Sequence, residues 1–232
     1  MIDLHTHILF DVDDGAKSIE ESLLMLETAK DIGIHSVVLT PHVSKYRTYC
    51  KRSDEIYEKY ELLKKQAKHL NINLYLGAEV DEDDHLVKTI STSCTINHSN
   101  YVLIDFSMRH ADVSEVIYEL RHYGYKVIIA HPERIMYLKY EDLVGLKKEG
   151  ALLQVSSKHL VGLGDKKACK IARQLLKDDL IDLVSSDAHD VKTLLSMKKA
   201  FEYVLKKKGL IYANRLFVDN PFDIIHKQQS EG

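Results

Sequence analysis

The sequence predicts an α/β fold in which seven parallel strands form a barrel, and a single domain spans residues 1–232. The first observation is that seven short apolar segments alternate with helix-like segments, which is typical of parallel β-α-β units. The second is that six of the seven segments end in histidine, aspartate or glutamate. In a barrel these ends meet on one face, whereas an open doubly wound sheet would spread them along an edge. With 45% hydrophobic residues, the chain can bury the core of such a barrel.

The first strand ends in two histidines. Ile2 and Leu4 alternate with a polar residue, which is the pattern of a buried strand, and His5 and His7 follow. Positions i and i+2 of a strand point to the same face. Two imidazoles there form half of a divalent-metal site, and the acidic turn 11–15 follows at once.

The remaining elements follow in order along the chain. A capping box at Ser18–Glu21 predicts a helix through Asp31, with Gly33 just past its end. Apolar runs predict strands at 36–40, 74–78, 101–104, 126–130, 151–155 and 182–186. The stretches between them predict helices at 53–70, 113–123, 140–149, 166–177 and 191–207.

The polar side chains at the strand ends are candidate metal ligands, and they are His5, His7, His42, Glu79, Asp105, His131, Asp187 and His189. With Asp13 or Asp14 nearby, this set is too large for one ion. Imidazole and carboxylate ligands without thiolate suit zinc, iron or manganese, and a shared carboxylate commonly bridges two ions. The alternative for any single histidine is an ordinary core or surface role.

The charge balance and the cysteines argue against several other classes. There are 32 basic and 35 acidic residues, so the net charge of −3 gives no global attraction for nucleic acid or an anionic membrane. No apolar run approaches the length of a membrane span, and we expect a cytoplasmic protein without membrane insertion. None of Cys50, Cys94 and Cys169 has the arginine six residues later that a Cys-x5-Arg phosphate loop requires. A cysteine-dependent phosphatase is therefore not favoured.

A basic loop follows the third histidine of the set. Residues 43–52 contain two tyrosines and four basic residues, Lys45, Arg47, Lys51 and Arg52. We interpret this loop as a surface for a broad, exposed substrate. The alternative is a solvated connection to the next helix.

These motifs resemble, in order and context, the polymerase and histidinol phosphatase (PHP) superfamily: His5-x-His7, Pro41-His42, Glu79, His131-Pro132 and Asp187-Ala188-His189. A closer likeness is to its bacterial capsule and exopolysaccharide branch, through Asp13-Asp14-Gly15, Gly77-x-Glu79 and the run from Ala130 to Arg134. Members of that branch are manganese-dependent protein-tyrosine phosphatases that act on a tyrosine autokinase controlling polymer synthesis. The resemblance implies a distorted (β/α)7 barrel, and two or three Mn²⁺ ions with iron or zinc as alternatives.

The resemblance also implies a role for each residue. One ion would take His5, His7, Glu79 and Asp187, and a second would share Glu79 and take Asp105 and His131. A third would take Asp14, His42 and His189, because the family motif favours Asp14 where spacing alone leaves Asp13 open. We assign catalysis to Arg134, His42 and Asp14. Substrate binding is assigned to Arg134, Lys17, Arg47 and Arg52.

The chain departs from this family pattern at two positions. Asp105 stands where glutamate is usual, so the second ion could be bound more weakly or through water. Leu194 stands where a second arginine is usual. Leu194 either faces the site or packs on the barrel, and both interpretations remain open from the sequence.

The expected chemistry is hydrolysis of a phosphate monoester. A bound metal lowers the pKa of water towards about 7, so attack on phosphorus needs no protein nucleophile. A tyrosyl phenolate, with a pKa of about 10, leaves more easily than a serine alkoxide. The expected substrate is the phosphotyrosine-bearing tail of a bacterial tyrosine kinase, and a homo-oligomer is compatible with the sequence. The alternatives are a small-molecule phosphatase of the histidinol-phosphate type and a non-catalytic regulator or nuclease-like relic.

Overall fold

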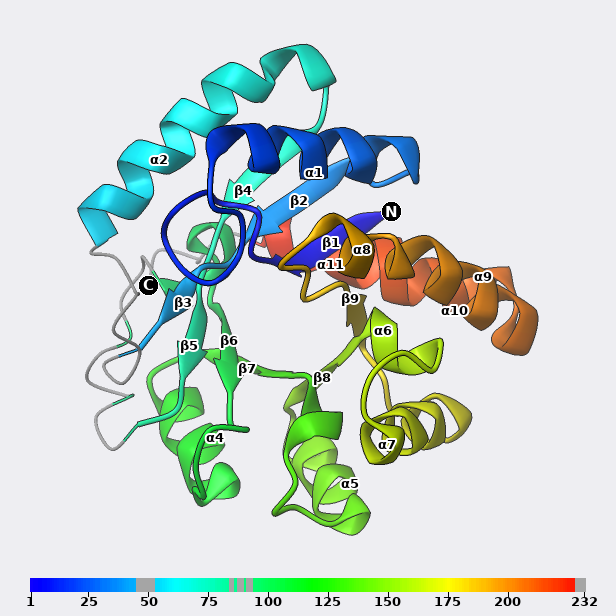
Figure 1. The fold of residues 1–232 in the computed structure, drawn as a ribbon. Coiled ribbons are helices and arrows are strands. Elements are labelled where there is room, and N and C mark those ends of the chain that lie inside the picture. Colours follow the sequence, from blue (N-terminus) through cyan, green and yellow to red (C-terminus); the bar gives the residue numbers. More distant parts are fainter. Residues whose placement is uncertain (45–52, 84–85, 87–89, 91–93, 228–232) are drawn as a thin grey trace.

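Parallel strands form a ring at the centre of the protein (Figure 1). The structure, a computed structural model, describes residues 1–44, 53–83, 86, 90 and 94–227. Within these residues one sheet has the order β1 (Ile2–Thr6), β2 (Ser36–Leu39) and β4 (Asn73–Leu76). The other has the order β3 (His42–Val43), β5 (Glu79–Asp81), β6 (Tyr101–Asp105), β7 (Lys126–Ala130), β8 (Leu152–Ser156) and β9 (Leu183–Ser185).

Two positions in the ring are each occupied by a pair of consecutive strands. β2 leads into β3, and β4 leads into β5, with a two-residue break in each case. The pairing continues across the breaks, because Gly77 N donates to Leu39 O (2.9 Å) and Glu79 N donates to Pro41 O (3.1 Å). A Cβ atom on Gly77 would lie 2.9 Å from the Ile96 side chain, so a larger residue here would force Ile96 to shift. The described strands therefore occupy seven positions around the ring.

The ring closes between the last strand and the first. Thr6 and Ala188 form a parallel bridge, His7 N donates to Ala188 O (2.9 Å), and Asp187 N donates to His5 O (3.0 Å). The closure thus depends on a few bonds between the end of β1 and the residues that follow β9. Together with the two breaks that separate the sheets, it confirms the expected distorted (β/α)7 barrel.

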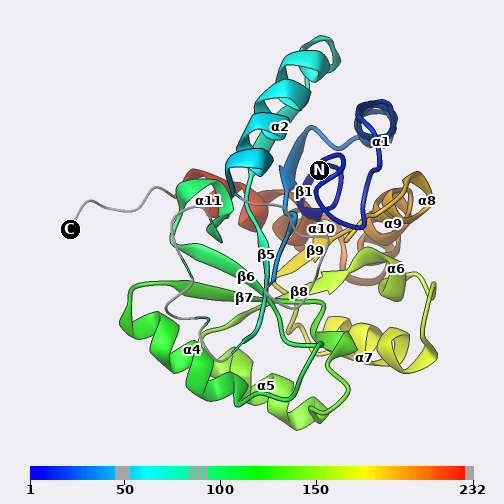
Figure 2. The ribbon, with the colours of Figure 1, turned by 60° about the vertical axis from the view of Figure 1, so that its left-hand side comes forward.

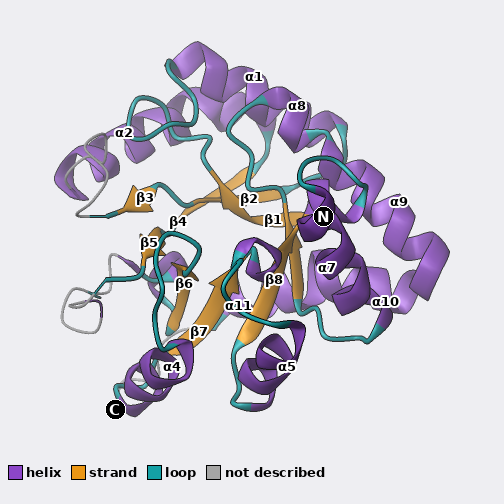
Figure 3. Ribbon diagram, turned by 60° about the horizontal axis from the view of Figure 1, so that its bottom comes forward, coloured by secondary structure: helices purple, strands orange, loops and turns teal. Residues whose placement is uncertain are grey.

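Helices surround the strands, as all the ribbon views show (Figures 1, 2 and 3). The helices that the sequence predicts are confirmed as α1 (Ile19–Asp31), α2 (Ser53–Gln66) continued by η1 (Ala67–Leu70), α4 (Val113–His122), α5 (Tyr140–Lys148) and α7 (Lys166–Lys177). The Ser18 hydroxyl accepts a hydrogen bond from Glu21 N (3.4 Å), as the capping box predicts. Among the described residues, no helix combines the length and the apolar content needed to cross a membrane.

Several helical segments differ from the prediction or were not expected. The helix predicted at 191–207 is divided into α8 (Val191–Leu194) and α9 (Ser196–Lys208). Three short helical turns lie next to strands. η3 (Ile96–His98) precedes β6, η4 (Pro132–Arg134) follows β7, and α6 (Ser157–Leu160) follows β8. The chain then continues through α10 (Leu210–Asn214), the π-helical segment η5 (Arg215–Asp219) and α11 (Asn220–His226).

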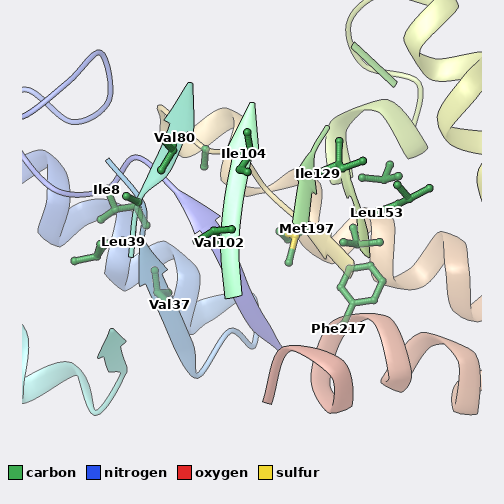
Figure 4. Close-up of a cluster of buried hydrophobic side chains, with 14 of the residues drawn as sticks. Ile8, Val37, Leu39, Val80, Val102, Ile104, Ile129, Leu153, Met197 and Phe217 are labelled. Carbon is green, nitrogen blue, oxygen red and sulfur yellow. The ribbon is translucent and has the colours of Figure 1, made fainter. Parts of the chain in front are cut away.

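Two apolar layers hold the strands in place. Alternate residues of a strand face opposite sides, so Val102 and Ile104 belong to an outer layer. The same layer includes Ile129, Met197 and Phe217 (Figure 4). The inner layer consists of Ile2, Leu4, Val38, Ile96, Tyr101, Leu103, Ile128, Ala130, Leu183, Ile224 and Ile225. The last two belong to α11, which contacts β1 and η3 and covers the inner layer. Polar side chains are thereby left to the opposite end of the ring.

Candidate metal centre

Buried polar side chains gather where the strands end. His5 and His7 come from the end of β1, His42 begins β3, Asp105 ends β6, His131 follows β7, and Asp187 and His189 follow β9. Glu79 is buried among them, with 1% of its surface exposed. The sequence placed Glu79 after a strand, but it begins β5, because the chain breaks at Gly77 and then pairs with the sheet again. The convergence of these residues on one face is confirmed.

Hydrogen bonds determine which ring nitrogens of His5 and His7 face the centre. His5 Nδ1 donates to Gln154 Oε1 (2.9 Å), and His7 Nδ1 donates to Asp13 Oδ2 (2.8 Å). In the neutral imidazole the other nitrogen then carries a lone pair, and the two Nε2 atoms lie 3.2 Å apart. Two lone pairs this close would repel each other, and either a proton or a metal ion between them removes the repulsion. The pair therefore fits a metal ion.

A second convergence of the same kind lies towards solvent. His189 Nδ1 donates to Asp187 O (3.1 Å), which turns His189 Nε2 to within 3.2 Å of Asp14 Oδ1. His42 Nε2 lies 3.5 Å from the same oxygen. The Asp14 and His189 side chains are 47% and 31% exposed, so this part of the centre is open to water. A cation would again relieve the repulsion between lone pair and carboxylate.

Glu79 lies in the middle of the histidines. Its Oε2 atom is 2.9 Å from His42 Nδ1, 3.2 Å from His5 Nε2 and 3.3 Å from His7 Nε2, and its Oε1 atom is 2.8 Å from His131 Nε2. Burial raises the pKa of Glu79, but His5 and the hydrogen bonds with His131 and His42 outweigh burial and hold the pKa well below its ordinary value. This buried carboxylate therefore remains ionised and attracts cations.

The protonation of His7 shows how strongly the centre favours positive charge. Burial lowers the pKa of His7, but hydrogen bonds with Asp13 and Glu79 outweigh burial and raise the pKa to about 10. A metal ion competes with this proton for the Nε2 lone pair, so metal binding should release protons.

Three groups of ligand atoms are compact enough to hold an ion. Within each group the atoms all lie within 4.8 Å of one another, and the groups are His5, His7 and Asp187; His5, Glu79 and His131; and His7, Asp14, His42 and His189. The structure thus brings together all the predicted ligands except Asp105. The donors are nitrogen and oxygen without thiolate, which fits zinc, iron or manganese.

The family model for capsular polysaccharide synthesis, CpsB/CapC, matches residues 1–226. The chain belongs to the CpsB/CapC family. The tyrosine-protein phosphatase CpsB of Streptococcus pneumoniae is 34% identical over 98% of this chain and 99% of its own length. These matches confirm the resemblance that the motifs indicated.

Solved structures support the same relationship. The crystal structures of YwqE from Bacillus subtilis and CpsB from Streptococcus pneumoniae, described as metal-dependent tyrosine phosphatases, include a chain that is 28% identical with a TM-score of 0.88, covering 99% of this chain and 96% of that one. Histidinol phosphate phosphatase from Lactococcus lactis, solved with zinc, L-histidinol and phosphate, is 13% identical with a TM-score of 0.56, covering 88% and 94%. The second likeness shows the fold alone.

The neighbouring residues Asp13 and Asp14 make different contacts in this CpsB/CapC member. Asp13 Oδ2 accepts from His7 Nδ1 and from His42 N (3.2 Å), and its Oδ1 accepts from Gly15 N (2.9 Å). Burial raises the pKa of Asp13, but His7 outweighs burial and lowers the pKa to about 2. Asp14 instead belongs to one of the three ligand groups. The geometry therefore favours Asp14 as a ligand and Asp13 as the residue that orients His7.

Asp105 lies on the far side of His131. Its Oδ1 atom is 3.9 Å from His131 Nδ1 and accepts from Ser107 N (2.6 Å). Among the residues that the structure describes, Asp105 belongs to none of the compact ligand groups. Its side chain is one methylene shorter than the glutamate that is usual at this position in the family. Asp105 as a direct ligand stays a prediction.

Two cations lie beside Asp187. Arg134 Nη1 donates to Asp187 Oδ2 at 3.2 Å, and Lys158 Nζ donates to the same oxygen at 3.1 Å. The sequence predicted Arg134 as a phosphate-binding residue but did not single out Lys158. The available signal was its place directly after the polar pair Ser156-Ser157, where the sixth predicted strand ends.

The other predicted substrate-binding residues have different outcomes. Lys17 is exposed beside the acidic turn, and its Nζ donates to Asp13 O (3.4 Å). Arg47 and Arg52 lie outside the described residues. Leu194 is fully buried in the outer apolar layer. The interpretation in which Leu194 faces the site is therefore wrong, because α8 presents it to the core.

Proposed function

We propose that this protein is a metal-dependent protein-tyrosine phosphatase. The observation that carries the proposal is the convergence of the His5 and His7 Nε2 atoms on Glu79, with Asp187 and Arg134 at the edge of the same centre. Such a centre suits hydrolysis of a phosphate ester. The relatives named as tyrosine-protein phosphatases support the choice of substrate.

We propose two or three manganese ions, with iron or zinc as alternatives. The ligands would be His5, His7, Glu79 and Asp187 for one ion, Glu79, His131 and Asp105 for a second, and Asp14, His42 and His189 for a third. When bound, such ions supply an activated water and neutralise charge on the phosphoryl group. The buried carboxylate of Glu79, between four imidazoles, would be shared by two of the ions.

The protein side chains bind and orient the substrate. The Arg134 side chain is 39% exposed, and its planar guanidinium can donate to two phosphoryl oxygens at once. His42 and Asp14 lie towards the open side, where they would hold the third ion beside the attacking water. In the reaction the bond from phosphorus to the phenolic oxygen breaks and the water oxygen bonds to phosphorus. The departing phenolate, with a pKa of about 10, needs no dedicated acid.

Cysteine chemistry has no role in this mechanism. Cys94 and Cys169 are buried, and burial raises the pKa of the Cys169 thiol, which disfavours the nucleophilic thiolate. Cys50 lies outside the described residues, and the residue six positions after it is Ile56 rather than arginine.

The finer parts of the proposal concern the cell. We propose that the substrate is the phosphotyrosine-bearing tail of a bacterial tyrosine kinase in the cytoplasm, and that the reaction regulates capsular or exopolysaccharide synthesis. The description of the family as one of capsular polysaccharide synthesis supports this proposal. Residues 1–232 would act as one domain, without a nucleic-acid partner, and a homo-oligomer is compatible with it.

Metal removal tests the proposal directly. The protein is dialysed against chelator, its metal content is measured, and it is assayed with phosphotyrosine and phosphoserine peptides of one sequence. We expect activity to disappear, to return with manganese, and to be faster on phosphotyrosine because of the better leaving group. Full activity after verified metal removal would sink the metal mechanism. Equal rates on both peptides, or faster turnover of histidinol phosphate, would support the small-molecule alternative.

A further inference from the structure

Lys158 is a second positive charge at the edge of the metal centre. It comes from α6, the single turn that follows β8, whereas Arg134 comes from η4 after the neighbouring β7. Both side chains donate to one oxygen, Asp187 Oδ2, at 3.1 and 3.2 Å. The Lys158 and Arg134 side chains are 27% and 39% exposed, so a ligand can reach both from solvent.

The two oxygens of Asp187 face different partners. Oδ1 lies 3.6 Å from both His5 Nε2 and His7 Nε2, on the side of the predicted ions. Oδ2 faces the two cations. Lys158 and Arg134 are therefore separated from the ligand histidines by a single carboxylate. A phosphoryl group in contact with the ions would lie within reach of both.

At this edge two cations pair with one carboxylate oxygen. The same carboxylate also faces the ligand histidines. The second ionisation of a phosphate monoester has a pKa of about 6, so at neutral pH its phosphoryl group carries almost two negative charges. A phosphate diester carries only one. The pair of cations therefore matches the charge of a monoester better than that of a diester.

Buried hydrogen bonds hold the segments that carry the two cations together. Glu133 Oε1 accepts from Ser156 N (2.9 Å) and from His159 Nδ1 (2.7 Å). Glu133 is fully buried, and the His159 side chain is 4% exposed. This links η4 to the junction of β8 and α6, so the backbones beside Arg134 and Lys158 keep a constant separation. Preorganised cations of this kind bind an anion with little reordering.

We propose that Lys158 acts with Arg134 to bind the dianionic phosphoryl group, and that this pair makes the site select phosphate monoesters over diesters. The inference rests on the proposed phosphatase function and deepens it. The incoming phosphoryl oxygens replace Asp187 Oδ2 as the partner of both cations. Lys158 is thereby a substrate-binding residue.

The test compares Lys158→Met with the wild type, both loaded with manganese, on p-nitrophenyl phosphate and bis(p-nitrophenyl) phosphate. We expect kcat/KM for the monoester to fall tenfold or more, mainly through KM, because a charge-assisted hydrogen bond is lost. For the diester the change should be much smaller. Lys147→Met is the matched control, since Lys147 pairs with Asp182 at similar exposure, 26%, but outside the centre.

Two further measurements separate substrate binding from a structural role. Calorimetric titration with inorganic phosphate should show tenfold or more weaker binding to Lys158→Met, while Lys158→Arg keeps most of the affinity because it keeps the charge. Manganese content should be equal in wild type, Lys158→Met and Lys147→Met.

The outcomes distinguish the inference from the function on which it rests. Unchanged phosphate affinity with an unchanged ratio of monoester to diester activity overturns the inference. Loss of manganese from Lys158→Met, with equal loss of both activities, also overturns it, because Lys158 would then support the metal ligands. A wild type that hydrolyses no monoester contradicts the proposed function itself, and the phosphate titration still decides the role of Lys158.

Discussion

The two ends of the strand ring contain opposite kinds of side chain. At the end covered by α11, Leu103 and Ile128 pack with Ile224 in the inner apolar layer. At the other end, two residues along β6, Asp105 is buried among the residues of the metal centre. Apolar burial stabilises the first region, whereas buried ionisable groups oppose folding unless they are paired or bind a metal. Stability and chemistry are therefore separated along the same strands, and substitutions at the two ends should have different effects.

Glu79→Gln should give the largest effect at the polar end. The substitution removes the one carboxylate that four imidazoles approach, so we expect manganese binding to fail and kcat/KM to fall about a thousandfold. Metal analysis and steady-state kinetics measure both quantities. Full manganese content together with normal activity would show that Glu79 is no ligand. It would also contradict the assignment of metal binding to the polar end of the ring.

Leu194→Arg tests the assignment of Leu194 to the outer apolar layer and not to the polar end. Leu194 is fully buried, so an unpaired charge there should lower the free energy of unfolding by about 3 to 5 kcal/mol without any kinetic gain. Denaturant unfolding and kinetics provide the measurements. Leu195→Arg is the matched control, because the Leu195 side chain is 40% exposed and this position should tolerate the charge. A higher kcat/KM at unchanged stability would return Leu194 to the site.

Ile128→Ala should weaken the apolar end and leave the chemistry intact. Truncating this buried side chain should lower the free energy of unfolding by about 2 to 5 kcal/mol. At a temperature where the variant is folded, manganese content and kcat should match the wild type. Leu24→Ala, at a position 53% exposed, is the control and should change stability little. A large loss of manganese from folded Ile128→Ala would mean that the two ends are coupled.

Asp13→Asn should give the smallest effect, because Asp13 acts through His7. The amide cannot hold the His7 Nδ1 proton as a carboxylate does, so we expect manganese affinity to fall about 10- to 100-fold. Saturating manganese should restore most of kcat. Asp11→Asn in the same turn is the control, since the Asp11 side chain is 63% exposed and bonds Lys59. If kcat stays low at saturating metal, Asp13 takes part in the chemistry itself.

The sequence predicts which polar side chains converge, because the strand pattern determines where a side chain must point. His5 and His7 follow from a period of two, and Asp187 and His189 follow an apolar run in the same way. The choice between Asp13 and Asp14 could not be made from spacing, since both belong to one turn. They are separated by the positions of Asp13 Oδ2 beside His7 Nδ1 and of Asp14 Oδ1 beside His189 Nε2.

Other features depend on contacts that no local pattern contains. Lys158 is one of many lysines, and its role appears only when β8 lies beside β7 and brings it to Asp187. Leu194 is ambiguous because a short helix near the site can face either way, and tertiary packing decides. The helices after residue 208 were not predicted, although Ile224 and Ile225 complete the inner layer.

The closure of the ring has a consequence for the order in which the protein becomes active during synthesis. Ser186 N donates to Asp3 Oδ1 across 183 positions of the sequence, and Asp187 N donates to His5 O beside it. The ribosome releases the histidines of β1 first, but their partners on the last strand emerge only after most of the chain. Contacts so distant in sequence form late, because closing a long loop costs conformational entropy. A nascent chain that stops before β9 therefore lacks a complete metal centre, so premature termination cannot release an active phosphatase.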